Sequence, residues 1–112
     1  MNAAARISRL VSRRIQYLAR VQELAAEGFE LAPSARYVVR RADVAGYVAR
    51  GLGIDASPAL YQALLAATKA LGWEPTKSHN RSLYRRVKVR GMSDERALEL
   101  SQQLRRRPGS GE

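Results

Sequence analysis

Six basic side chains between residues 77 and 90 are the strongest chemical feature of this sequence, because no carboxylate lies among them. Lysine and arginine bind phosphate oxygens, and each base that neutralises a nucleic-acid phosphate releases condensed counterions. His79 and Asn80 add hydrogen-bonding groups, and Tyr84 adds an aromatic ring of the kind that stacks on a base. The stretch predicts a polyanion-binding surface whose bases are Lys77, Arg81, Arg85, Arg86, Lys88 and Arg90.

The overall charge supports the same prediction. The chain has 112 residues and a net charge of +10, of which residues 57–92 carry +6, from seven bases and one acid. A concentrated positive field attracts nucleic acid, with DNA favoured over RNA here; an acidic protein or an anionic membrane is the alternative. Residues 1–27 carry +3 and hold a second basic strip, formed by Arg6, Arg9, Arg13 and Arg14.

Catalytic and metal-binding chemistry is not expected. The chain has no cysteine, which removes disulfides, thiolate nucleophiles and zinc sites that need sulfur. His79 is the only histidine, and no pair of carboxylates is spaced for acid–base work. Residues 51–56, GLGIDA, match a dinucleotide-binding pattern, but a helix rather than a strand is expected before them. We therefore interpret these glycines as a helix stop and expect no enzyme activity, cofactor or metal.

Helical spacing of apolar residues, together with capping residues, predicts four helices. Ser57 and Pro58 are favourable at a helix start, and Gly72 just past a helix end. Ser93 caps the last helix, and Gly28 is expected to end the first as a left-handed C-cap. The predicted helices are 3–27, a short one from Arg41 that Gly51 and Gly53 end, 57–72, and 93–107, followed by a flexible tail at 108–112.

Strands are predicted where β-branched and aromatic residues alternate. Residues 36–40 form one strand, and residues 73–77 a second, at a sheet edge because Pro75 cannot donate a backbone hydrogen bond. A turn follows at 78–80. The strand from Arg81 to Arg90 then places Leu83, Val87 and Val89 on one face and Tyr84, Arg86, Lys88 and Arg90 on the other. Bases on alternate residues, about 6.6–7 Å apart, could follow a phosphate backbone.

The order of these elements resembles that of a winged helix-turn-helix domain. More narrowly, residues 36–91 resemble the C-terminal winged-helix segment of phage and plasmid primase–helicases, where a helix ending in Leu-Gly-aromatic, here Leu71-Gly72-Trp73, precedes an Arg-rich wing. The resemblance implies one mainly α-helical domain over residues 1–107, with a β-hairpin or three-stranded sheet and extra N- and C-terminal helices. It also implies a stand-alone DNA-binding module of a phage or mobile element, an accessory or regulatory factor whose wing lies on phosphates.

The second helix of a helix-turn-helix motif usually enters the major groove, and here that helix spans 57–72. Arg and Asn, the common base-reading residues, do not occur in it, so Gln62 and Lys69 are its only candidates. We therefore expect low sequence specificity. The alternative is a structural subunit that docks on protein or structured RNA, as in a ribosome or replication complex, through an Ala-rich face formed by Ala59, Ala63, Ala66 and Ala70.

The first helix carries apolar residues over 19 positions, from Ile7 to Ala25, more than a small domain easily covers. Self-association, as a homodimer or a larger complex, would cover the excess; the final helix could cover it instead. Residues 1–22 are amphipathic and free of acid, like a mitochondrial presequence, so a mitochondrial location is the alternative to the cytoplasm of a bacterial or phage-infected cell. No membrane-spanning segment is expected, because no apolar run approaches the ~20 residues of a membrane span, and a membrane is not among the expected partners.

Overall fold

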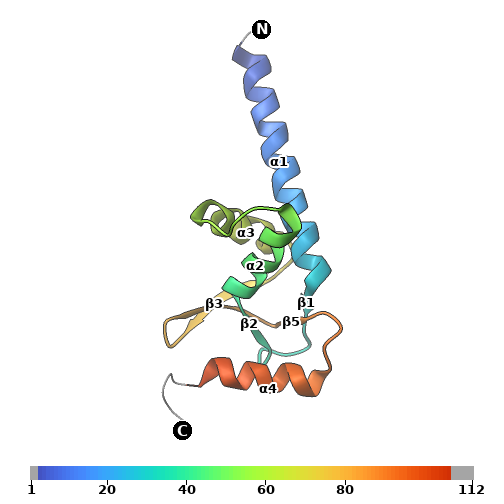
Figure 1. Ribbon diagram of the computed structural model, residues 1–112, viewed down its shortest axis with the longest axis vertical. Helices are drawn as coiled ribbons and strands as arrows, with labels where there is room; N and C mark the ends of the chain where they lie inside the picture. The colour runs from blue at the N-terminus through green and yellow to red at the C-terminus, as the bar shows by residue number, and fades with distance from the viewer. Residues whose placement is uncertain (1–2, 107–112) are drawn as a thin grey trace.

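The computed structural model describes residues 3–106, with side chains from residue 11 onward (Figure 1). It shows a mainly α-helical chain with two small antiparallel sheets, which confirms the predicted fold class at that level. Arg107 and the predicted tail at 108–112 lie outside the described residues. Within the described part, no helix combines the length and the apolar character needed to cross a membrane. The elements are α1 (Ala3–Gly28), β1 (Phe29–Leu31), β2 (Val38–Arg40), α2 (Arg41–Leu52), α3 (Pro58–Ala70), β3 (Glu74–Ser78), β4 (Arg81–Arg85), β5 (Val87–Val89) and α4 (Asp94–Arg105).

A three-stranded sheet contains the predicted hairpin. β3 pairs with β4, and β2 pairs with the other edge of β4, which gives the order β2-β4-β3. The turn consists of His79 and Asn80, whose φ angles of 51° and 69° give the left-handed backbone of a two-residue type I′ turn. β3 lies at the sheet edge, as Pro75 predicts. The predicted strand before Arg41, the edge strand and the turn are therefore confirmed.

A second, two-stranded sheet replaces the end of the predicted long strand. Arg86 has a φ of 64°, which ends β4, and β5 then pairs with β1 instead of β2 or β3. Backbone hydrogen bonds fix this bulge: the N–H of Ala32 donates to the carbonyl of Arg86 at 2.8 Å, and the N–H of Arg86 donates to the carbonyl of Tyr37 at 2.7 Å. The prediction of one continuous strand over 81–90 is wrong, and no sequence pattern predicted β1.

The main core lies between α1, α2, α3 and the adjacent strands. Tyr84 is completely buried there, and its hydroxyl lies 3.1 Å from the hydroxyl of Thr68. Edge-to-face contacts lead from Tyr84 through Trp73 and Phe29 to Tyr47, with ring centroids between 5.6 and 6.3 Å apart. This aromatic row joins the hairpin to β1 and α2.

The last helix, α4, lies along the free edge of β2. Ser101 is buried there, and its Oγ accepts a hydrogen bond of 3.0 Å from the backbone N–H of Val38, in place of a neighbouring strand. Ser93 is the N-cap of α4, as predicted, and its side chain accepts a backbone hydrogen bond. Figure 1 shows α4 and the N-terminal half of α1 at opposite ends of the molecule. The alternative in which the final helix covers the apolar stripe of the first is therefore wrong for the described residues.

Two glycines lie where elements pack closely. Gly28 does not have the left-handed backbone predicted for it; a Cβ there would lie 2.8 Å from the ring of Tyr47. Gly51 lies inside α2, and a Cβ there would lie 2.6 Å from the buried side chain of Leu24. Gly53, with a φ of 70°, is the residue that ends α2, which confirms the predicted helix stop.

Replacing Gly51 with alanine is expected to lower the free energy of unfolding by about 1 kcal/mol, because the added methyl group overpacks the contact between α1 and α2. Urea denaturation followed by circular dichroism measures the change. Gly46→Ala is the matched control in the same helix, since a Cβ there meets only the end of Arg50 at 4.0 Å. That control should stabilise the helix by about 0.5–1 kcal/mol. Equal stabilisation by both substitutions would contradict the close contact at Gly51.

Candidate nucleic-acid interface

Two arginines of the predicted basic surface are used inside the fold as C-terminal helix caps. The guanidinium of Arg81 donates to the carbonyls of Gln103 and Leu104, at 3.3 and 3.0 Å, in the last turn of α4. The guanidinium of Arg90 donates at 3.0 Å to the carbonyl of Ala26, in the last turn of α1. A cation in this position satisfies carbonyls that lack a partner in the helix and interacts favourably with the helix dipole. These two charges therefore stabilise the fold.

Two further bases of the surface are neutralised by carboxylates. Lys88 is only 13% exposed, and its Nζ lies 2.9 Å from Asp94 and 4.0 Å from Glu30, its partner residue in the β1–β5 ladder. The hydrogen bond to Asp94 is the main reason why the pKa of Lys88 is raised. Arg85 forms an ion pair with Glu74 across the hairpin, and the hydrogen bond from Arg85 lowers the pKa of Glu74.

The predicted row of Tyr84, Arg86, Lys88 and Arg90 on one strand face is wrong. Tyr84 faces the core and offers no surface on which a base could stack. Arg86 is the bulge residue between the two sheets, so the residues after it belong to a different sheet from Tyr84. The row therefore does not exist as a continuous track for a phosphate backbone.

Among the described side chains, four residues of the predicted stretch are exposed and held neither by a carboxylate nor by a helix carbonyl: Lys77, His79, Asn80 and Arg86. Arg90 is exposed as well, but the carbonyl of Ala26 holds its guanidinium. Within residues 11–106, none of the four side chains forms an ion pair. His79 and Asn80 form the tip of the hairpin, and Arg86 lies at its base. Lys77 lies opposite Ser82 in the ladder, four residues before Arg86, so the rise per residue places the two bases about 13 Å apart along the hairpin. The surface predicted from six bases thus reduces to two bases and the turn.

Replacing Arg86 with glycine is expected to raise the free energy of unfolding by about 0.5–1 kcal/mol. A left-handed backbone costs a residue with a Cβ about 1–2 kcal/mol, and part of that gain is lost to the greater chain entropy of glycine. Thermal and urea denaturation measure the effect. Arg86→Ala is the control, because it removes the same charge and retains the strain; if it stabilised the protein as much as glycine does, strain at Arg86 would not be the cause.

The surface of α3 is rotated relative to the prediction. Ala63, predicted to be exposed, is completely buried, and Thr68 is 1% exposed, whereas Leu65 is 37% exposed. Gln62 and Lys69 are both exposed, as the base-reading hypothesis requires, and their spacing of seven residues places them on one face of the helix.

The second basic strip lies on α1. Arg13 and Arg14 are exposed, and the guanidinium of Arg14 lies 5.9 Å from the ring centroid of Tyr17. The strip's other two members, Arg6 and Arg9, lie outside the residues whose side chains the structure describes.

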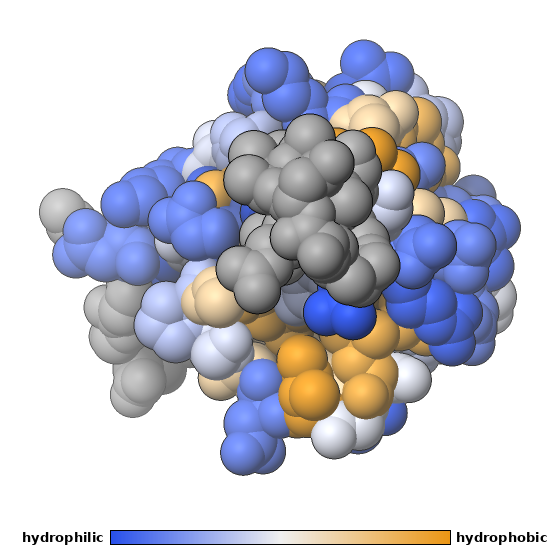
Figure 2. All heavy atoms as spheres, turned by 90° about the horizontal axis from the view of Figure 1, so that it is seen from above, coloured by the Kyte–Doolittle hydropathy of each residue, from blue (hydrophilic) through white to orange (hydrophobic). Residues whose placement is uncertain are grey.

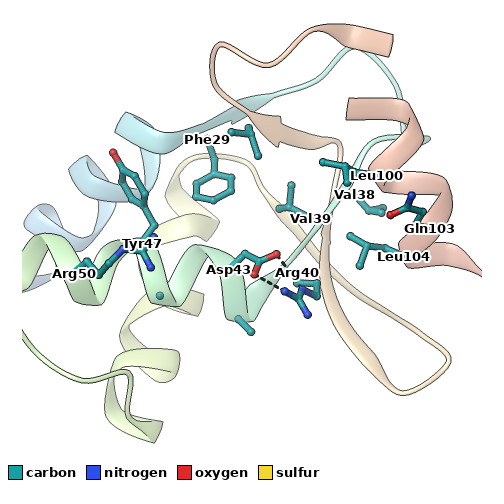
Figure 3. Close-up of a pocket in the computed structure, with 13 residues that line it drawn as sticks. Phe29, Val38, Val39, Arg40, Asp43, Tyr47, Arg50, Leu100, Gln103 and Leu104 are labelled. Atoms are coloured by element: carbon teal, nitrogen blue, oxygen red, sulfur yellow. Dashed lines mark hydrogen bonds and ion pairs between the residues drawn. The ribbon is translucent and has the colours of Figure 1, made fainter. Parts of the chain in front are cut away.

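A hollow of about 570 Å³ lies between α2, β2, β5 and α4 (Figure 3). Its wall is largely apolar, and it includes Phe29 and Leu100. At its rim, Arg40 at the end of β2 forms an ion pair with Asp43 in the first turn of α2, 2.8 Å apart. The hydrogen bond to Asp43 raises the pKa of Arg40. Among the residues described, no group of three His, Cys, Asp or Glu side chains is placed to hold a metal ion. The hollow is thus a mainly apolar surface with one ion pair at its rim.

Four further bases outside the predicted surface are exposed: Arg36, Arg50, Arg105 and Arg106. Sequence spacing does carry a signal for them. Arg20, Arg40 and Arg96 each have an acid three residues later and form an ion pair with it, whereas none of these four has an acid three or four residues away.

Comparison of the chain with protein-family models, with curated proteins and with solved structures finds no match.

Proposed function

We propose that this chain is a non-enzymatic nucleic-acid-binding protein built as a winged helix-turn-helix domain, with double-stranded DNA as its main ligand. In this assignment α2 and α3 are the helix-turn-helix, the β3–β4 hairpin is the wing, and α1 and α4 are additional helices. The element order and the sheet order β2-β4-β3 support it, as does the hairpin extending from the side of the body in Figure 1.

The observation that carries the proposal is the division of the basic residues into two groups. One group stabilises the fold through carbonyls and carboxylates, as Arg81, Arg90 and Lys88 do. The other group is exposed and has no carboxylate partner among the described side chains. Such an excess of like charge disfavours the compact state unless a polyanion binds it. This second group consists of Arg13, Arg14, Arg36, Arg50, Lys69, Lys77, Arg86, Arg105 and Arg106.

The proposed binding has low sequence specificity. Phosphate contacts position a protein on DNA without reading its sequence, and side chains suited to reading base edges are few here. On α3 the exposed candidates are Gln62 and Lys69, and the turn adds His79 and Asn80. An accessory or regulatory role in a phage or mobile element is the corresponding biological proposal, and it rests on the resemblance to the winged-helix segment of primase–helicases.

The direct test compares binding of the chain to duplex DNA, single-stranded DNA and RNA of matched sequence over a series of salt concentrations. We expect duplex DNA to bind most tightly, with several duplex sequences bound equally well. The logarithm of the binding constant should fall linearly with the logarithm of salt concentration, with a slope of about −0.9 for each phosphate contacted. Absence of binding to all three ligands at low salt would overturn the proposal, and stronger binding to RNA would overturn the choice of DNA.

The second candidate is a structural subunit that docks on protein or structured RNA. The exposed part of α3 favours it, because Leu65 lies there among alanines and the face carries little polar chemistry. This candidate predicts that substitutions at Leu65 weaken assembly and leave the salt dependence of DNA binding unchanged.

A further inference from the structure

The N-terminal half of α1 has an apolar stripe that the rest of the described chain does not cover. Val11 is 53% exposed and Ile15 is 61% exposed, which makes them two of the most exposed large apolar residues described. Leu18, one to two turns later, is partly buried, and Val21 and Ala25 are completely buried in the core. One stripe therefore runs from the core into solvent along a single helix.

The exposed stripe and the body of the protein together form a concave surface. Val11, Leu18 and Ala25 are seven residues apart, so they lie on the same face of α1. α2 and α3 pack against the C-terminal half of that face, and the projecting half extends beyond them (Figure 1). The exposed stripe thus forms one wall of an inner corner, and the body forms the other. An elongated segment fits such a corner, whereas a flat lipid surface would meet the body first.

The arginines beside the stripe indicate which kind of partner could bind in this corner. Arg13 and Arg14 flank the stripe, and neither has a carboxylate partner among the described side chains. Residues 1–22 contain five arginines and no acid, so a second copy of α1 would bring like charges together. Nucleic acid would neutralise the arginines but leave Val11 and Ile15 in water. Figure 2, which looks down on the molecule from the α1 end, shows hydrophobic surface bordered by hydrophilic surface.

We propose that this corner binds an acidic amphipathic helix of another protein. The apolar face of that helix covers Val11 and Ile15, and its carboxylates bind Arg13 and Arg14. The partner takes Arg13 and Arg14 out of the group of unpaired bases and leaves those of the hairpin and α3 for nucleic acid. The chain would therefore bind a nucleic acid and a protein partner at the same time.

The test uses the full chain and three synthetic helical peptides of about 18 residues, long enough to line the projecting half of α1. The first has a leucine stripe flanked by glutamates, the second has lysines in place of the glutamates, and the third keeps the glutamates but has glutamines in place of the leucines. Fluorescence anisotropy should show binding of the first peptide only. Val11→Ser/Ile15→Ser should weaken that binding at least about tenfold. The matched control, Leu31→Ser, removes an apolar side chain that is 55% exposed on β1 and should change it less than twofold.

Four results would overturn the proposal. Equal binding of the glutamine peptide would show that charge alone acts, and equal binding of the lysine peptide would show that charge plays no part. A dimer in sedimentation velocity that Val11→Ser/Ile15→Ser dissolves would make a second copy the occupant. Binding to phosphatidylglycerol vesicles that the same variant abolishes would make a lipid surface the occupant. The variant should bind DNA like the wild type, so this test is independent of the proposed nucleic-acid function.

Discussion

Replacing Arg90 with alanine is expected to lower the free energy of unfolding by about 2 kcal/mol, because hydrogen bonds from a charged donor contribute roughly 1.5–3 kcal/mol. The guanidinium donates to the carbonyls of Ala26 and Phe29, where α1 ends and β1 begins, and to the carboxylate of Glu30 at 2.9 Å. Its side chain is 49% exposed, so solvent screens the ion pair and the two carbonyl bonds provide most of the effect. Urea denaturation of the variant and the wild type measures the difference.

Two variants separate the parts of this effect. Arg90→Lys keeps the charge but cannot reach both carbonyls with a planar fork, so it should restore less than half of the lost stability. Glu30→Gln removes the ion pair and leaves the carbonyl bonds in place, so it should cost less than Arg90→Ala. If Arg90→Ala kept full stability and lost DNA affinity instead, Arg90 would be a phosphate contact and its role as a cap would be wrong.

Local signals in the sequence were sufficient to place the helices. Ser57 accepts the N–H of Leu60 at 3.2 Å, Pro58 starts α3, and Gly72 has the left-handed φ of 78° expected after a helix. Each of these features depends on neighbours within a few residues. The turn and the edge position of Pro75 were predictable for the same reason.

The features that were not predictable depend on contacts between residues far apart in the sequence. β1 is three residues long and exists because β5, about 60 positions later, pairs with it. Arg90 and its acceptor Ala26 are 64 positions apart, and Arg81 and Leu104 are 23 apart. Residue type and spacing show that an arginine is basic; they do not show which helix end will lie beside it. The strand over 81–90 was wrong because its break is stabilised by Ala32 and Tyr37.

The basic surface in the structure differs from the one predicted from the sequence for the same physical reason. A basic run in a sequence contains both the charges that hold a small fold together and the charges that remain for a ligand, and only the tertiary contacts separate them. In this run Arg81, Arg85, Lys88 and Arg90 are held by carbonyls or carboxylates, while Lys77 and Arg86 are not. An acid three residues later accompanies the paired bases Arg40, just before α2, and Arg96, within α4, but no such spacing applies across a hairpin or between sheets.

The combined variant Lys69→Ala/Lys77→Ala/Arg86→Gly is expected to bind duplex DNA on the order of 100-fold more weakly near 0.15 M salt. These three bases are exposed and unpaired among the described residues, and they lie on α3, on the hairpin strand and at the bulge. Each lost phosphate contact removes about 0.9 from the log–log salt slope, so the slope should become shallower by about 2–3 units. Binding isotherms at four or more salt concentrations measure both quantities.

A control with the same net charge shows whether position matters. Arg20, Arg40 and Arg96 are also exposed, but each is paired with an acid three residues later. Replacing these three with alanine removes three charges from the net +10 and leaves +7, as the first variant also does. If binding follows the unpaired bases, the control should keep the wild-type slope within about one unit. An equal loss in both variants would mean that net charge alone attracts DNA. An unchanged slope in the first variant would mean that the hairpin and α3 do not contact phosphate, and the interface would then have to lie elsewhere on the protein.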